Sequence, residues 1–216
     1  MPRRALMEKR PWLLASLVAA AAFYILRHDS LPEPVLLLLK GAGVGLLAVW
    51  ALLRHAGRDS QLLALALGLA ALGDVAVEWD LQAGGLCFFA GHIAAIALYT
   101  RHRRVALTPS QKAAAAALML LTPAIALLLT GDAQAALYAL ALGGMAAAAW
   151  ASGFPRYRVG IGAVLFVASD LLLLAGHGPH ATSAVADLLI WPLYYFGQFM
   201  IATGVVRSLR GPAQSS

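Results

Sequence analysis

Long apolar runs, separated by short polar connections, make up most of the chain. A helix needs about 20 apolar residues to cross the ~30 Å hydrocarbon core of a bilayer. We predict spanning helices at Trp12–Leu26, Pro34–Leu53, Gln61–Trp79, Ala83–Tyr99, Lys112–Thr130, Ala133–Ala151, Gly160–Gly176 and Val185–Val206. Pro, Gly or charged residues mark the connections between them. The pattern predicts an all-α, polytopic membrane bundle of eight transmembrane helices.

One of these runs and one of the connections allow a second interpretation. The first is short and follows a basic N-terminus, as a signal peptide does, but its exit from Phe23 to Arg27 has no small-residue cleavage site, so we interpret it as a helix. The fourth and seventh runs are also short. The break at Thr130–Asp132 is compatible with a turn between helices or with a re-entrant bend.

Composition supports a membrane protein. The 216 residues are 61% hydrophobic and 12% charged, with a mean hydropathy of +0.77, which excludes a soluble domain. The single cysteine, Cys87, excludes an intramolecular disulfide and a thiolate metal cluster. We expect a multi-pass protein of the plasma membrane, which is the inner membrane if the chain is bacterial.

The chain has a net charge of +6, and the positions of its basic residues indicate the membrane topology. Most bases fall on one side of the predicted spans, at Arg3, Arg4, Lys9, Arg10, Arg54, Arg58, Arg101, Arg103, Arg104, Lys112, Arg156, Arg158, Arg207 and Arg210. The other side is mainly acidic. The positive-inside rule therefore places both termini in the cytoplasm, and we expect no nucleic-acid partner.

Similar short sequences recur at an interval of about 100 residues. The matches are Phe88–His92 with Tyr194–Gln198, Gly73–Asp74 with Ser169–Asp170, and Trp50–Ala51 with Trp150–Ala151. They predict one membrane domain over 1–216, built from a parallel 4+4 duplication with halves at about 11–104 and 111–210 and a disordered tail at 211–216. A functional site would then lie between the halves. Chance similarity between Ala- and Leu-rich helices is the alternative.

Two carboxylates lie inside predicted spans. An Asp at a helix centre costs about 3 kcal/mol of insertion free energy, so an intramembrane Asp is by default a functional-site candidate. Counted from the helix ends, Asp74 lies about 20 Å, Asp170 about 18 Å and His92 about 18 Å above the cytoplasmic edge. Because lipid does not satisfy them, we expect these groups to face one internal cavity. Static interhelical hydrogen bonding, or capping of a carbonyl by His92, is the alternative.

Other polar residues at similar depth are candidates for substrate binding: Lys40, Glu78, Tyr138, Tyr194, Tyr195 and Gln198. Lys40 is either a counter-ion for a carboxylate or a base that snorkels outward. Glu78 is expected one turn above Asp74 on the same helix face. Tyrosines and a glutamine at such positions are more often packing and membrane-interface residues than substrate contacts. His177 and His180 lack a third ligand, so we expect no metal site and no cofactor.

Taken together, these residues resemble the YhhN-like lysoplasmalogenase family of eight-span membrane proteins. The residues that carry the resemblance are Lys40, Leu72–Asp74, Gly85–Leu86, Phe89, His92, Gly162–Ala163, Phe166, Ser169–Asp170, Tyr194–Tyr195 and Gln198. The resemblance covers nearly the whole chain, through the order and spacing of motifs that are individually unspecific.

The resemblance implies hydrolysis of the vinyl ether bond of lysoplasmalogens, alkenyl-glycerophosphocholine or -ethanolamine, to a fatty aldehyde and a glycerophospho-alcohol. This reaction needs a proton donor and a negative charge beside the cation that forms. We hypothesise that Asp170 donates the proton, Asp74 stabilises the cation and activates water, and His92 relays protons, or that the two Asp roles are reversed. Lys40 and the tyrosines would hold the phosphate.

Two other classes remain open. A proton-coupled transporter of lipids or small molecules also uses intramembrane Asp and His in a two-half design. A zinc hydrolase of the alkaline-ceramidase kind is disfavoured, because the spans contain too few histidines. The expected partners are a lysophospholipid substrate and membrane lipids, and the sequence leaves the oligomeric state open.

Overall fold

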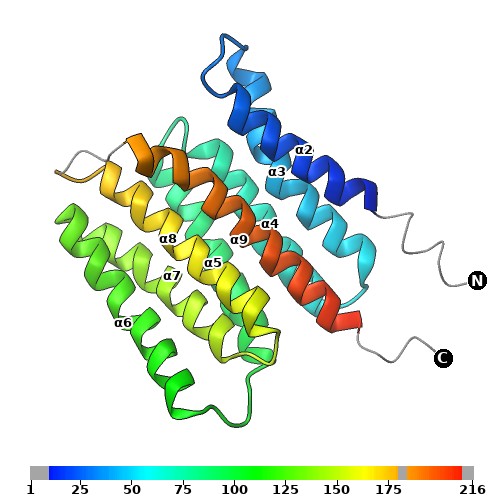
Figure 1. Cartoon of the computed structure of the whole chain (residues 1–216), viewed down its shortest axis with the longest axis vertical. Helices are drawn as coiled ribbons and strands as arrows, with labels where there is room; N and C mark the ends of the chain where they lie inside the picture. Colours follow the sequence, from blue (N-terminus) through cyan, green and yellow to red (C-terminus); the bar gives the residue numbers. More distant parts are fainter. Residues whose placement is uncertain (1–9, 180–183, 211–216) are drawn as a thin grey trace, which may run out of the picture. The chain divides into compact units, whose positions relative to one another are not determined.

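The computed structural model describes residues 10–179 and 184–210, and this part of the chain forms eight α-helices and one π-helical turn. They are α2 (Arg10–Leu26), α3 (Glu33–Arg54), α4 (Arg58–Ala76), α5 (Leu81–Arg101), α6 (Pro109–Thr130), α7 (Ala133–Ala151), η1 (Arg156–Gly160), α8 (Ile161–Gly176) and α9 (Ala184–Arg210) (Figure 1). Seven spans, from α3 to α9 with η1 joined to α8, are long and apolar enough to cross a membrane, and α2 is a shorter apolar helix of 17 residues. The prediction of an all-α, multi-pass membrane protein is confirmed.

Most helix ends lie within a few residues of the predicted ones, and α7 matches the prediction at both ends. The fourth and seventh spans are longer than expected. α5 runs from Leu81 to Arg101, and η1 extends the seventh span back to Arg156. Because backbone groups must be satisfied internally near lipid, the helices continue through the charged residues at their ends.

The third span has the predicted length of 19 residues but begins and ends three residues earlier in the chain. We expected a helix to Trp79, but α4 ends at Ala76 and Val77–Trp79 form a turn. The side chain of Asp80 accepts hydrogen bonds from the backbone N–H groups of Gln82 at 2.8 Å and Ala83 at 3.2 Å, which starts α5 at Leu81. Glu78 is therefore outside the helix that carries Asp74.

The chain divides into two compact units. The first unit takes the chain up to Ala94 and again from Leu209, and the second unit is Ala95–Ser208. The boundary falls inside α5. The predicted duplication stays a prediction, and residues 211–216, for which we predicted disorder, lie outside the described residues.

Helices of the first unit pack through small residues. α3 packs against α2 and α4, and the buried hydroxyl of Ser16 donates to the carbonyl of Gly43 at 2.5 Å (Figure 1). At the α4–α5 connection, a Cβ on Gly84 would lie 2.7 Å from Val77. These small residues allow the helix backbones to approach one another closely.

In the second unit, α6 and α7 form a helical hairpin, and α8 packs against both. Gly131 takes a left-handed conformation with φ 68°, and Asp132 caps α7 by accepting from the Gln134 N–H at 2.8 Å. The Thr130–Asp132 break is therefore a turn between helices. α8 approaches α9 where Gly162 meets Gly197, at a point where a Cβ on Gly162 would lie 2.7 Å from the Gly197 carbonyl oxygen.

Candidate functional site

Asp170 is buried in the second half of α8, with 5% of its surface exposed. The hydroxyl of Tyr138, on α7, donates a hydrogen bond to its Oδ2. The neighbouring Ser169 donates to the carbonyl of Ile190 on α9 at 2.8 Å. α8 is thus fixed on two sides beside a carboxyl group, one oxygen of which is held by a phenol. We predicted Tyr138 as a substrate contact, and its observed position is on the carboxylate itself.

Aromatic side chains cover α8 from the side of α9. Trp191, Tyr194 and Tyr195 are buried. The ring of Tyr194 meets Phe166 edge-on at 5.2 Å between centroids, and Trp191 stacks on Tyr195 at 6.3 Å. Such pairs stabilise packing beyond the area that they bury. Both predicted tyrosines therefore belong to an ordered aromatic wall next to the helix of Asp170, and their contact with substrate stays a prediction.

Gln198 follows that wall on α9 and is also buried, with 5% exposed. An amide in a buried position is usually hydrogen-bonded, so its presence in an apolar helix marks a polar place in the second unit. Its predicted role in substrate binding stays a prediction.

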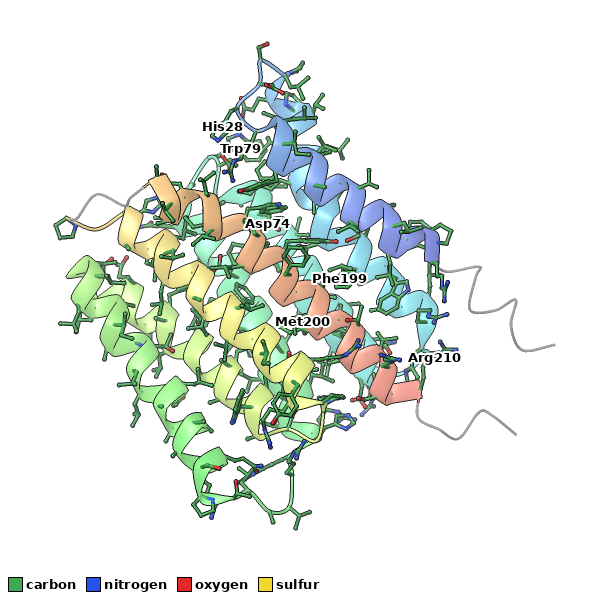
Figure 2. The ribbon with its side chains drawn as sticks, viewed as in Figure 1. His28, Asp74, Trp79, Phe199, Met200 and Arg210 are labelled. Atoms are coloured by element: carbon green, nitrogen blue, oxygen red, sulfur yellow. The ribbon has the colours of Figure 1, made fainter. Side chains whose placement is uncertain are left out.

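The first unit holds the second buried carboxylate. Asp74 is 3% exposed and lies two residues before the end of α4, with Trp79 in the turn that follows (Figure 2). His92, on α5, is 2% exposed. Between these two helices the ring of Phe88 lies against Gly73, so close that a Cβ on Gly73 would lie 2.9 Å from it. A glycine directly before Asp74 therefore allows α4 and α5 to approach.

Lys40 is paired, which favours the counter-ion interpretation. Its Nζ donates to Oε1 of Glu78, and it lies 5.7 Å from the centroid of the Phe23 ring. Close by in sequence, the indole N–H of Trp79 donates to Glu33 at 3.0 Å. The side chain of Lys40 is 12% exposed and that of Glu78 46%. Our expectation that Glu78 shares a helix face with Asp74 was wrong, because α4 ends before it; its charge is directed at Lys40.

The candidate residues fall into two groups. Lys40, Asp74, Glu78 and His92 belong to the first unit, and Tyr138, Asp170, Tyr194, Tyr195 and Gln198 to the second. Each group includes buried polar side chains from two helices, which are Asp74 and His92 in the first and Asp170, Tyr194, Tyr195 and Gln198 in the second. The cavity that we predicted between Asp74 and Asp170 stays a prediction.

Two residues near these groups were missed by the sequence analysis. Trp191 lies three and four residues before Tyr194 and Tyr195, which is the spacing of one helix face, so its position was available from the sequence. Phe23 lies on α2, far from Lys40 in sequence, and no local pattern connects the two.

Among the residues that the structure describes, no group of three or more His, Cys, Asp or Glu side chains is placed to bind a metal ion. His177 Nδ1 lies 2.9 Å from the Leu173 carbonyl oxygen at the end of α8. His180 lies outside the described residues.

Comparison with known proteins identifies a family. The model of the YhhN family matches residues 35–205, which extend from α3 to α9 and include every candidate site residue. No curated protein matches the chain, and no solved structure does.

Proposed function

The chain belongs to the YhhN family, which is lysoplasmalogenase-like, and we propose that it hydrolyses the vinyl ether bond of lysoplasmalogens. The substrate is an alkenyl-glycerophosphocholine or -ethanolamine, and the products are a fatty aldehyde and a glycerophospho-alcohol. A lysolipid has one long chain and a polar head group, so it reaches a multi-pass protein from the bilayer. In a bacterial cell the enzyme would act in the inner membrane.

The observation that carries the proposal is the environment of Asp170. A carboxyl group buried in an apolar helix costs insertion free energy, and here a phenol is directed at one of its oxygens. With Tyr138 on Oδ2, Oδ1 is the oxygen that exchanges a proton with the substrate. An oriented carboxyl group of this kind suits general acid catalysis.

The reaction balances with water as its only co-reactant. A proton adds to the alkene carbon that is not bonded to oxygen, which leaves an oxocarbenium ion. Water adds to that cation and loses a proton, giving a hemiacetal. The hemiacetal then breaks its bond to the glycerol oxygen, which takes a proton, so that aldehyde and alcohol leave. One proton donor and one proton acceptor are therefore sufficient.

Two carboxylates divide these roles in the proposal. Asp170 donates the proton from Oδ1, while Asp74 stabilises the cation and accepts the proton of the attacking water, with His92 as a relay. Glycosidases use the same division to form and consume a similar cation. Tyr138 acts as a positioning residue, and Lys40, which is paired with Glu78, supplies a cation for the substrate phosphate in the first unit.

The test is turnover by the purified full-length protein in detergent. Aldehyde release is measured from an alkenyl lysolipid and, in parallel, release of fatty acid from the ester-linked lysolipid of the same chain length. We expect hydrolysis of the alkenyl substrate alone, unchanged by a chelator, and loss of activity in Asp170→Asn.

A matched control is Asp132→Asn in the same unit. Asp132 is an exposed N-cap, and Asn caps a helix equally well, so this variant should keep full activity. Absence of aldehyde from the wild-type protein, combined with gradient-dependent uptake into sealed vesicles, would instead support the transporter class.

A further inference from the structure

The two connections of the second unit that lie on its predicted cytoplasmic side are held together. Arg103 and Ser152 form an isolated antiparallel bridge, and the Gly153 N–H donates to the His102 carbonyl at 2.6 Å. The guanidinium of Arg104 donates to the carbonyls of Ser152 at 2.6 Å and Phe154 at 3.3 Å. This arrangement fixes the segment after α7, so that η1 starts from a defined position.

Arg156 opens η1 and is held differently from Arg104. Its Cζ lies 5.6 Å from the centroid of the Trp150 ring. Within the described part of the chain, its Nε and Nη2 atoms are buried without a hydrogen-bond partner, and so is Nε1 of Trp150. Three N–H donors of this cation–π pair therefore lack an acceptor, and each such group costs free energy.

Gly160 makes room for this pair. A Cβ at Gly160 would lie 2.9 Å from the Trp150 ring and 3.1 Å from Cγ of Arg156. The helix bearing Gly160 is π-helical, a form that occurs frequently at functional sites. The close packing of Trp150 and Arg156 thus depends on a glycine and on a local change of helix type.

No carboxylate of the second unit can satisfy these donors. Between Ala95 and Ser208 the only acids are Asp132, Asp170 and Asp187. Asp132 caps the end of α7 opposite Trp150, Asp170 lies inside α8 beyond η1, and Asp187 lies in the first turn of α9. The end of the unit that carries Arg156 is thus rich in bases and has no carboxylate from this unit.

We propose that Arg156 and Trp150 bind the phosphate of an anionic phospholipid of the cytoplasmic leaflet. The Nε and Nη2 edge of arginine matches two oxygens of a phosphate, and an indole N–H serves a third. Trp150 and Tyr157, which is 79% exposed, are residue types that favour the membrane interface. This placement favours a lipid head group over a soluble anion.

Arg103, an exposed base of the bridged α5–α6 connection, adds its charge to that of Arg156, and the two charges favour a head group without a cation. The choline or ethanolamine group of a zwitterionic lipid would meet these charges, whereas phosphatidylglycerol brings only negative charge. Because the donor atoms of both side chains are covered by protein, Arg156 and Trp150 turn outward when the phosphate binds, and they then make the hydrogen bonds that they lack in the free protein.

The test measures lipid binding, not turnover, and so is independent of the proposed function. Delipidated full-length protein in detergent is titrated with phosphatidylglycerol or phosphatidylcholine, and bound lipid is counted by native mass spectrometry. We compare the wild type, Arg156→Gln, Arg156→Lys and two charge-matched controls, Arg158→Gln and Arg207→Gln, which are both exposed residues of this unit.

We expect tighter binding of phosphatidylglycerol than phosphatidylcholine, a loss of about tenfold in Arg156→Gln, and a smaller loss in Arg156→Lys, which keeps the charge without the planar edge. The controls should change binding by less than about twofold, as expected for exposed charges in solution. Millimolar inorganic phosphate should not displace the lipid.

Equal losses in all three Gln variants would overturn the proposal in favour of diffuse charge. Wild-type binding by Arg156→Lys would overturn the hydrogen-bonded site, and displacement by inorganic phosphate would overturn the assignment to a lipid. If Arg156→Gln does not fold, as judged by size exclusion and helical circular dichroism, the comparison of Arg156→Lys with the wild type decides.

Discussion

The helices α4 and α8 carry the same local sequence feature, a small residue followed by a buried Asp. The surroundings of that Asp differ between the two helices. On α8, Asp170 lies six residues before the helix end and accepts from Tyr138, while Ser169 is bonded to α9. On α4, Asp74 lies two residues before the end, and the glycine before it makes room for the Phe88 ring.

This difference shows that the depth of a residue in the membrane does not determine how far it lies from the end of its helix. Counting residues from the cytoplasmic end put both carboxylates at nearly the same depth, and the count is unaffected by where the helix stops. The stop depends on Asp80, which captures backbone N–H groups and begins α5. As a result one Asp is surrounded by regular helix and the other is close to a turn.

The largest expected effect comes from removing either carboxyl group. Asp170→Asn and Asp74→Asn should each lower the rate of aldehyde release by about 10²- to 10⁴-fold, because each removes a group that moves a proton. If the two act in one reaction, the double variant should be little worse than the poorer single variant.

Asp29→Asn is the control for this comparison, since Asp29 is exposed in the connection after α2 and the change is chemically the same. Retained activity in Asp74→Asn alone would assign the chemistry to the second unit. Retention in both variants would remove carboxylate catalysis altogether.

The next effect tests how tightly α8 is held. Gly162→Ala should lower the free energy of unfolding by about 1–3 kcal/mol, because its Cβ would lie 2.7 Å from a backbone oxygen of α9, which is not free to move. Thermal unfolding in detergent, followed by circular dichroism, measures the loss.

Gly68→Ala on α4 is the matched control. A Cβ there meets nothing within 4 Å, so the variant should be neutral or more stable by up to about 1 kcal/mol. Equal stability of both variants would contradict the close approach of α8 and α9.

Most of the helices could be predicted from the sequence, because a bilayer requires apolar segments of a certain length, and each predicted segment is a helix in the structure. α7 is predicted at both ends, since Asp132 is a good N-cap and Ser152 ends the apolar run. What failed was the end of α4 and the start of the seventh span. Both depend on hydrogen bonds around Asp80 and on π-helical packing at Gly160, which hydropathy does not encode.

For the candidate site, the sequence identified which polar residues are buried but not their partners. Asp74, His92, Asp170 and Gln198 are all buried, as their cost in an apolar run implied. The bond from Tyr138 to Asp170 joins residues of two helices and has no local signature. The same holds for Lys40, whose partner Glu78 was assigned to the face of Asp74 until the turn at Val77 removed it from the helix.

A smaller effect is expected from the hydrogen bond between Tyr138 and Asp170, the buried Asp of α8. Tyr138→Phe deletes one hydroxyl and should lower kcat about fivefold, which corresponds to a hydrogen bond of about 1 kcal/mol, with KM nearly unchanged. A positioning role moves kcat, whereas the substrate contact that we first predicted would move KM. Tyr157→Phe, at an exposed tyrosine of the same unit, should change neither.

The smallest effect concerns the ion pair of the first unit. In a double-mutant cycle of Lys40→Met and Glu78→Gln, the coupling free energy in unfolding should be about 0.5 kcal/mol, because Glu78 is 46% exposed and water weakens the attraction. Added salt should reduce the coupling. If Lys40 also holds the substrate phosphate, Lys40→Met raises KM while Glu78→Gln, which frees the ammonium group, leaves KM unchanged or lowers it. Equal increases of KM in both variants would mean that the pair only holds α3 to the turn after α4, and the first unit would then contribute Asp74 and His92 without a phosphate contact.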